Sequence, residues 1–151
     1  MKRKIYFLIC FLLVLLFSYT GLQKWMHMQK TLYNMRNQLF SRPVADMLAY
    51  GLPFVEMAVA ILLIFVSTRK LGLYLSFLLL FLFTSYVAAI LLGVFHRVPC
   101  SCGGIIDSLG WTAHLWLNLF FLFISLIGIR YHTIFMHETG VAEKPNQSRQ
   151  Y

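Results

Sequence analysis

The chain has 151 residues, of which 60% are hydrophobic and only 12% are charged, and its formal net charge is +8. This length fits one domain, and the composition excludes an ordinary soluble globular protein. The positive charge does not indicate nucleic-acid binding, because the Lys and Arg residues flank apolar segments instead of alternating with aromatic residues that stack on bases.

Four apolar segments are long enough to cross a bilayer, which takes about 20 residues in a helix. Each span must satisfy its backbone hydrogen bonds internally, so the sequence predicts an all-α membrane protein built as a four-transmembrane-helix bundle. The predicted bundle occupies residues 1–137, with spans at 5–22, 48–66, 71–95 and 111–131.

The two ends of the chain differ in character. Lys2-Arg3-Lys4 precedes the first span, and no small-residue cleavage site follows that span, so we expect an uncleaved signal anchor. Residues 138–151 are rich in polar side chains, and we expect a disordered cytoplasmic tail there.

An amphipathic helix is predicted between the first two spans, at residues 25–39. Apolar residues recur there at alternating three- and four-residue intervals, which places them on one helix face: Trp25, Met28, Leu32, Met35 and Leu39. We expect this helix to lie in the outer membrane interface and to end before Pro43. It either anchors the bundle or forms a lid over a site in the bundle.

Lys and Arg residues set the expected orientation. The short connection Ser67-Thr68-Arg69-Lys70 is a good signal for the cytoplasmic side. Both termini then lie in the cytoplasm, and the connection between the third and fourth spans faces outward, to an oxidising compartment where disulfides persist.

That outer connection contains the stretch Pro99-Cys100-Ser101-Cys102-Gly103-Gly104. Two thiols one residue apart can form a disulfide, bind a soft metal or exchange with the thiols of a partner. The two glycines allow the tight backbone that so small a disulfide ring needs. We predict reversible thiol–disulfide chemistry at Cys100 and Cys102.

A metal site is the weaker alternative for these thiols. Its ligands for Cu(I) or zinc would be His96, Cys100, Cys102 and His114. Their spacing is not a standard zinc pattern, so we expect no metal. Cys10, deep in the first span, is expected to be a core or lipid-facing residue.

The second span contains Pro53 and the acidic residue Glu56. An ionised carboxylate at the centre of a span costs about 2.5–3.5 kcal/mol on insertion scales, so Glu56 should face the bundle interior and find a partner. Lys24, at the outer end of the first span, is the nearest basic candidate. Glu56 is then either a packing clamp or a group that relays protons or hydrogen-bonds a quinone.

The fourth span carries His114 and Asn118, which are four residues apart and therefore share a helix face. Trp111 lies one turn before His114, in the outer half of the span. Alone, Asn118 would be a hydrogen-bonding contact between helices and His114 an interfacial residue. Together with the cysteines and Glu56, they are expected to form a polar cluster on one side of the membrane, which either serves helix packing or binds a cofactor.

The chain resembles the DoxX/MauE group of redox-associated membrane proteins over all four spans. The residues that carry the resemblance are Thr20-Gly21-Leu22-Gln23-Lys24, Pro53 with Glu56, the cysteine–glycine stretch, Trp111-Thr112-Ala113-His114 and Asn118. The resemblance implies a four-helix bundle in a bacterial cytoplasmic membrane. MauE is associated with disulfide formation in a periplasmic enzyme subunit, and DoxX relatives with quinone-linked sulfur oxidation.

A looser similarity is to the vitamin K epoxide reductase-like and DsbB-like proteins. They also join a cysteine pair to quinone in a four-helix bundle. Their active cysteines are separated by two residues, whereas Cys100 and Cys102 are separated by one, and this chain has no second outer cysteine pair.

The function we predict is a quinone-linked thiol–disulfide oxidoreductase. Cys100 and Cys102 exchange with a periplasmic thioredoxin-fold or other thiol protein. The electrons pass to a membrane quinone held by Glu56, His114, Asn118 and Trp111. The alternatives are a non-catalytic membrane subunit or assembly partner with a structural disulfide, and a membrane protein that handles a soft metal.

Overall fold

The computed structural model describes residues 2–38, 40–94 and 110–138, and the elements in these three ranges are all helical. They are α1 (Lys2–Met26), α2 (Met28–Arg36), α3 (Arg42–Ile64), α4 (Arg69–Leu91) and α5 (Trp111–Glu138). Four of them, α1, α3, α4 and α5, contain segments long and apolar enough to cross a membrane. The predicted all-α class and its four spans are therefore confirmed, and the chain is a multi-pass membrane protein.

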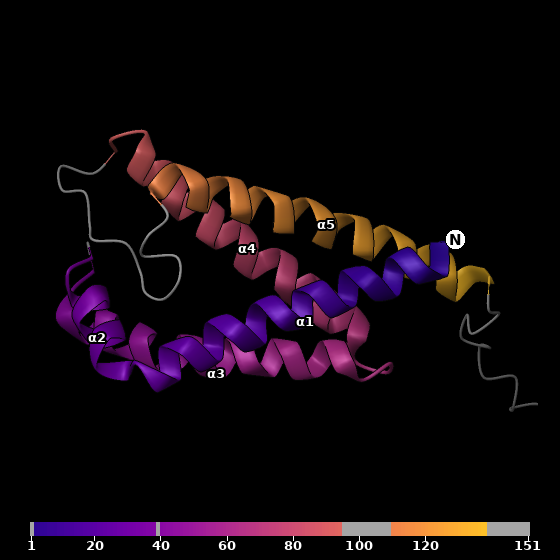
Figure 1. Cartoon of the computed structure of the whole chain (residues 1–151), viewed down its shortest axis with the longest axis horizontal. Helices are drawn as coiled ribbons and strands as arrows, with labels where there is room; N and C mark the ends of the chain where they lie inside the picture. The colour runs from indigo at the N-terminus through magenta and orange to yellow at the C-terminus, as the bar shows by residue number, and fades with distance from the viewer. Residues whose placement is uncertain (1, 39, 95–109, 139–151) are drawn as a thin grey trace, which may run out of the picture.

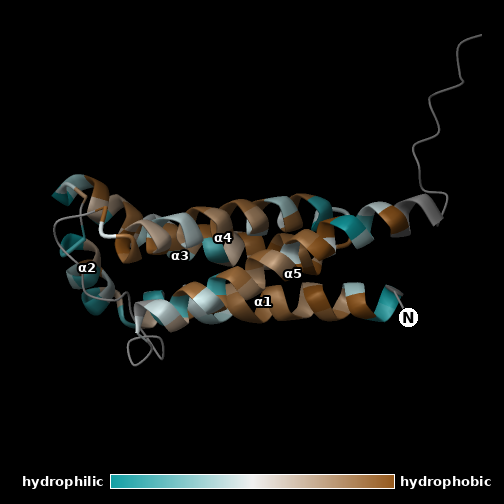
Figure 2. Cartoon of the chain, turned by 90° about the horizontal axis from the view of Figure 1, so that it is seen from above, coloured by the Kyte–Doolittle hydropathy of each residue, from teal (hydrophilic) through white to brown (hydrophobic). Residues whose placement is uncertain are grey.

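The four long helices are arranged as two pairs (Figure 1). Helix α1 packs mainly against α3, and α4 packs mainly against α5. The pairs come together near the N-terminus of α1 and separate toward the end of the bundle that carries α2 (Figure 1). The surfaces of the long helices are mostly apolar, whereas α2 carries many hydrophilic residues (Figure 2).

The converging end of the bundle is filled by an apolar core. Its fully buried side chains include Leu13 and Phe17 of α1, Leu63 of α3 and Leu80 of α4. Cys10 is buried beside them, as expected for a core residue. This packing closes the bundle on the side away from α2.

The α3–α4 connection is fixed at this same end. The Arg69 side chain donates hydrogen bonds from Nε to the carbonyl oxygen of Leu63 and from Nη2 to that of Ile64, both at 2.9 Å. These contacts satisfy two carbonyl groups that the end of α3 leaves without helical partners. A Cβ atom on Gly72 would lie 3.0 Å from the backbone nitrogen of Leu63, so a glycine lets α4 begin close to α3.

The helix boundaries differ from the predicted ones for local reasons. Helix α3 begins at Arg42, because Pro43 occupies the first turn, where its missing N–H and fixed φ favour a helix start. Pro43 was predicted to end the preceding helix, and the structure shows that it also lies in the first turn of the next one. Helix α4 ends at Leu91 instead of residue 95, and Gly93 with φ +67° turns the chain away.

The predicted helix between the first two spans is only partly matched. Helix α2 covers Met28–Arg36, and Trp25 belongs to α1, where half of its surface is exposed. The buried residues of α2 are Thr31, Asn34 and Met35. The predicted apolar face is matched in part: Met35 and the partly buried Leu32 pack with Ala45 and Ala49 of α3, but the polar residues Thr31 and Asn34 are buried as well.

Candidate functional site in the membrane-embedded cavity

A glycine brings α1 and α3 into close contact at the edge of the site. A Cβ atom on Gly21 would lie 3.2 Å from the carbonyl oxygen of Pro53 and 3.3 Å from Cβ of Glu56. These distances are tighter than most Cβ contacts, so a glycine here lets the two helices approach closely without a shift of α3. Lys24, three residues after Gly21, is thereby placed against Glu56.

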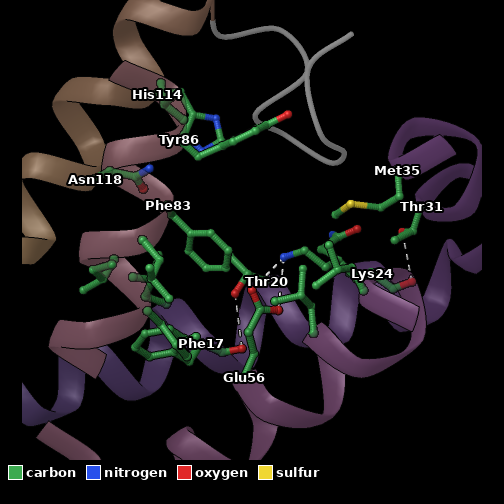
Figure 3. Close-up of a pocket in the computed structure, with 18 of the residues that line it drawn as sticks. Phe17, Thr20, Lys24, Thr31, Met35, Glu56, Phe83, Tyr86, His114 and Asn118 are labelled. Carbon is green, nitrogen blue, oxygen red and sulfur yellow. Dashed lines mark hydrogen bonds and ion pairs between the residues drawn. The ribbon is translucent and has the colours of Figure 1, made fainter. Parts of the chain in front are cut away.

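Lys24 and Glu56 form a buried ion pair (Figure 3). Nζ of Lys24 donates hydrogen bonds to Oε1 of Glu56 at 2.8 Å and to Oε2 at 3.1 Å. Glu56 is 1% exposed, so its carboxylate depends on this partner. The expectation that Glu56 faces the interior beside Lys24 is confirmed, and Thr20 lies next to the pair (Figure 3).

A partly open cavity of about 420 Å³ lies between the two helix pairs. Its lining is largely apolar toward the core, with Phe17, Leu80 and Phe83 among the residues there. The polar lining comes from several helices and includes Thr20, Lys24, Thr31, Gln38, Glu56, Tyr86, His114 and Asn118. An apolar cavity with a few convergent polar groups is the usual form of a small-molecule site.

Helix α5 supplies polar groups that have no partner within the described part of the chain. His114 and Asn118 both line the cavity, as their four-residue spacing predicted. Nδ1 of His114 and Nδ2 of Asn118 are buried and make no hydrogen bond there, and Asn118 is only 6% exposed. Buried polar groups are nearly always hydrogen-bonded in native proteins, so these two atoms mark a place where a ligand can bind.

Helix α2 and the residues after it form another wall. Oγ1 of Thr31 donates a hydrogen bond to the carbonyl oxygen of Lys24 at 3.2 Å. Arg36 holds α2 on α3 through two hydrogen bonds to Asp46, from Nε at 2.6 Å and from Nη2 at 2.9 Å. These hydrogen bonds to Asp46 raise the pKa of Arg36 above its ordinary value.

Tyr86 and Gln38 are among the cavity residues that were missing from the predicted site. Tyr86 of α4 donates a hydrogen bond to Oε1 of Gln38, and the ring of Tyr86 stacks on that of Phe40 with 5.8 Å between the ring centroids. In the sequence, Tyr86 reads as an ordinary interfacial tyrosine near the end of a span. Gln38 reads as a polar residue on the far side of the amphipathic helix. No motif or residue spacing in the sequence indicates that the side chains of Tyr86 and Gln38 contact each other.

The predicted thiol site falls outside the described residues, as do Cys100, Cys102 and His96. Trp111 begins α5, and its side chain also lies outside the described part. Helix α4 ends and α5 begins at the α2 end of the bundle, beside the opening between the helix pairs (Figure 1). The chain that contains both cysteines therefore leaves and rejoins the bundle at the end where the cavity lies.

Within the described ranges, no group of three or more His, Cys, Asp and Glu side chains is arranged to hold a metal ion. The predicted alternative ligand set includes three residues outside these ranges. Of that set, the described residue His114 faces the cavity beside Asn118.

The fold and the cavity define a class: a four-helix membrane protein with a polar-lined site between two helix pairs, at one end of the bundle. Residues 2–131 match the family model of methylamine utilisation protein MauE. The match covers most of the chain, which therefore belongs to the MauE family, a DoxX-like family of membrane proteins. Comparisons with curated proteins and with solved structures gave no match.

Proposed function

We propose that this MauE-family protein is a thiol–disulfide oxidoreductase of the bacterial inner membrane that passes electrons from a periplasmic thiol protein to quinone. The observation that carries the proposal is the cavity at the α2 end of the bundle, with buried polar atoms of His114 and Asn118 left without partners. A site of this kind suits a lipid-soluble ring with oxygen atoms at its edge.

The proposed reaction has two steps. A partner dithiol reduces the Cys100–Cys102 disulfide through a mixed disulfide, so the partner becomes a disulfide and the two cysteines become thiols. The two thiols then transfer two electrons and two protons to the quinone, which becomes hydroquinone while the Cys100–Cys102 disulfide re-forms. Sulfur and quinone exchange equal numbers of electrons, and no further oxidant is needed.

The cavity residues take different parts in this proposal. The Asn118 amide and the His114 ring hydrogen-bond a quinone oxygen from the α5 side. The Lys24–Glu56 pair lies across the cavity, where Glu56 passes protons to or from the second oxygen (Figure 3). Trp111, whose backbone begins α5, remains a predicted contact of the quinone, and its side chain lies outside the described part of the chain. Pro53 serves the packing of α3 against Gly21.

The proposed orientation places both termini in the cytoplasm and the cysteines in the periplasm. The Arg69 and Lys70 side chains at the α3–α4 connection support this, because basic residues in short connections favour the cytoplasmic side. The family description is methylamine utilisation. The partner we propose is accordingly a secreted thiol protein of such a system, with a thioredoxin fold or with disulfides of its own.

The test uses purified full-length protein in detergent. The protein is reduced, freed of reductant and mixed with a short-tailed benzoquinone, and both the quinone absorbance and the free thiols are followed. We expect one quinone reduced for each pair of thiols lost, because the reaction transfers two electrons. Thiols that stay oxidised under mild reductant would support a structural disulfide instead, and thiols protected by bound metal would support metal handling. Either result contradicts the proposal.

Replacing Asn118 by leucine should weaken quinone binding and leave the ligand-free protein at least as stable. Leaving a buried polar group unpaired costs about 1–3 kcal/mol, and leucine of similar size removes that cost. The same change removes a hydrogen bond to the ligand, worth about 1 kcal/mol net or about fivefold in affinity. The thermal unfolding midpoint and the quinone dissociation constant are measured on the same preparation.

Asn34→Leu is the matched control for this prediction. Nδ2 of Asn34 is also buried without a partner in the described structure, but Asn34 does not line the cavity. This variant should raise stability and leave quinone affinity unchanged. An equal loss of affinity in both variants would show that the Asn118 effect is not a contact with the ligand.

A further inference from the structure

The width of the cavity depends on the distance between the two helix pairs. The pairs are packed together at the core end and separate toward α2, so the cavity is bounded at its mouth by elements that belong to different pairs (Figure 1). One wall carries Lys24 and Glu56, and the opposite wall carries His114 and Asn118 (Figure 3). A ligand that touches both walls must match their separation.

Gln38 is attached to the α1/α3 pair. It follows α2, which is held on α3 by the hydrogen bonds from Arg36 to Asp46 and on α1 by the hydrogen bond from Thr31 to Lys24. Met35 of α2 also packs on Ala45 and Ala49 of α3. The backbone N–H of Gln38 donates a hydrogen bond to the carbonyl oxygen of Met35 at 3.1 Å, so the position of Gln38 follows that of α2 and the α1/α3 pair.

Tyr86 belongs to the other pair, because it lies in α4, which packs mainly on α5. Its hydroxyl group donates to Oε1 of Gln38, and its ring lies nearly parallel to that of Phe40, with 21° between the ring planes. The contact therefore joins the two helix pairs at the open end of the bundle. Gln38, Phe40 and Tyr86 all line the cavity, so the ligand lies against this bridge.

We propose that the Tyr86–Gln38 bridge fixes the separation of the cavity walls and thereby selects the size of the ring that the site accepts. This inference rests on the proposed function, since it takes the ligand to be a quinone. With the bridge intact, the pairs are held at one spacing, which favours a single-ring benzoquinone. Without it, the pairs can move apart at the mouth, and a fused-ring naphthoquinone gains relative to the smaller ring.

The experiment measures the affinities of a short-tailed benzoquinone and a short-tailed naphthoquinone by calorimetry in detergent. The variants are Tyr86→Phe, which removes the donor, Gln38→Met, which removes the acceptor at similar size, and the double variant. We expect each to shift the affinity ratio toward naphthoquinone by about fivefold, the net worth of one hydrogen bond. The double variant should shift it no further, because both changes break the same contact.

Tyr74→Phe is the control, since Tyr74 lies in the same helix, is half exposed and does not line the cavity. It should leave the ratio unchanged. If the wild-type protein binds neither quinone, the proposed function is wrong. If it binds quinone and the ratio stays constant in the bridge variants, or if their effects add, the proposed function stands and the bridge does not select the ring.

Discussion

We expect that replacing both Cys100 and Cys102 by serine abolishes the proposed quinone-dependent oxidation of the thiol partner and leaves membrane insertion and folding intact. Serine keeps the size and polarity of cysteine but cannot form a disulfide, so the exchange step with the partner is lost completely. Stability changes little, because a disulfide between residues so close in sequence closes almost no chain and restricts the unfolded state only slightly. Partner thiols are counted over time in membranes that contain quinone, with and without the variant.

Cys10→Ala is the control for this experiment. Cys10 is buried in the core of the converging end, among residues such as Leu13 and Leu63, on the side away from the cavity. Its removal should leave partner oxidation at the wild-type rate. Oxidation that persists in the double serine variant would leave a non-catalytic membrane subunit as the better interpretation.

The spans and the ion pair were predictable because a bilayer imposes large costs. A helix is among the few ways to satisfy the backbone in hydrocarbon, so apolar length alone identified α1, α3, α4 and α5. A carboxylate in a span needs a partner, and this requirement paired Glu56 with Lys24, although they are 32 residues apart. The four-residue spacing of His114 and Asn118 likewise placed both on the cavity wall.

The orientation of α2 was less predictable, because apolar periodicity assumes that a helix buries its apolar side. Near the open end of this bundle, the space beside α2 is a cavity with polar lining groups, and Thr31 of α2 is buried against it, while Trp25 at the end of α1 is half exposed. In a membrane protein, an exposed apolar side chain carries no penalty when it faces lipid. The sequence pattern therefore located the short helix but misassigned part of its face.

The Tyr86–Gln38 bridge could not be predicted from the sequence at all. It depends on how far the two helix pairs separate, and that angle results from the packing of the whole core. Two glycines lie where the pairs touch: Gly72 brings α4 onto the end of α3, and a Cβ atom on Gly128 of α5 would lie 3.0 Å from Cγ2 of Ile9 of α1. No spacing rule within one helix contains this information, whereas the pairing of Glu56 needed only the nearest opposite charge.

The Lys24–Glu56 pair should respond unequally to the loss of either partner. Lys24→Met leaves a carboxylate that is 1% exposed with no cation, whereas Glu56→Gln leaves Lys24, whose side chain is 21% exposed toward the cavity. Removing one partner of a buried pair costs about 3–5 kcal/mol when the remaining charge stays buried. We therefore expect that loss for Lys24→Met and a clearly smaller one for Glu56→Gln, measured by thermal unfolding in detergent.

The double variant Lys24→Met/Glu56→Gln separates the charge effect from the packing effect. It removes both charges, so it should be more stable than Lys24→Met alone. If the double variant is at least as unstable as Lys24→Met, the unpaired carboxylate is not the cause of the lost stability.

Glu56→Gln also tests the proton transfer, because glutamine keeps the shape and accepts the hydrogen bond from Lys24 but cannot take up a proton. This folded variant should bind quinone with nearly wild-type affinity and reduce it at least 100-fold more slowly, in line with the roughly 10²–10⁴-fold contribution of a general acid or base. Wild-type turnover in folded Glu56→Gln protein would make the pair a packing clamp between α1 and α3.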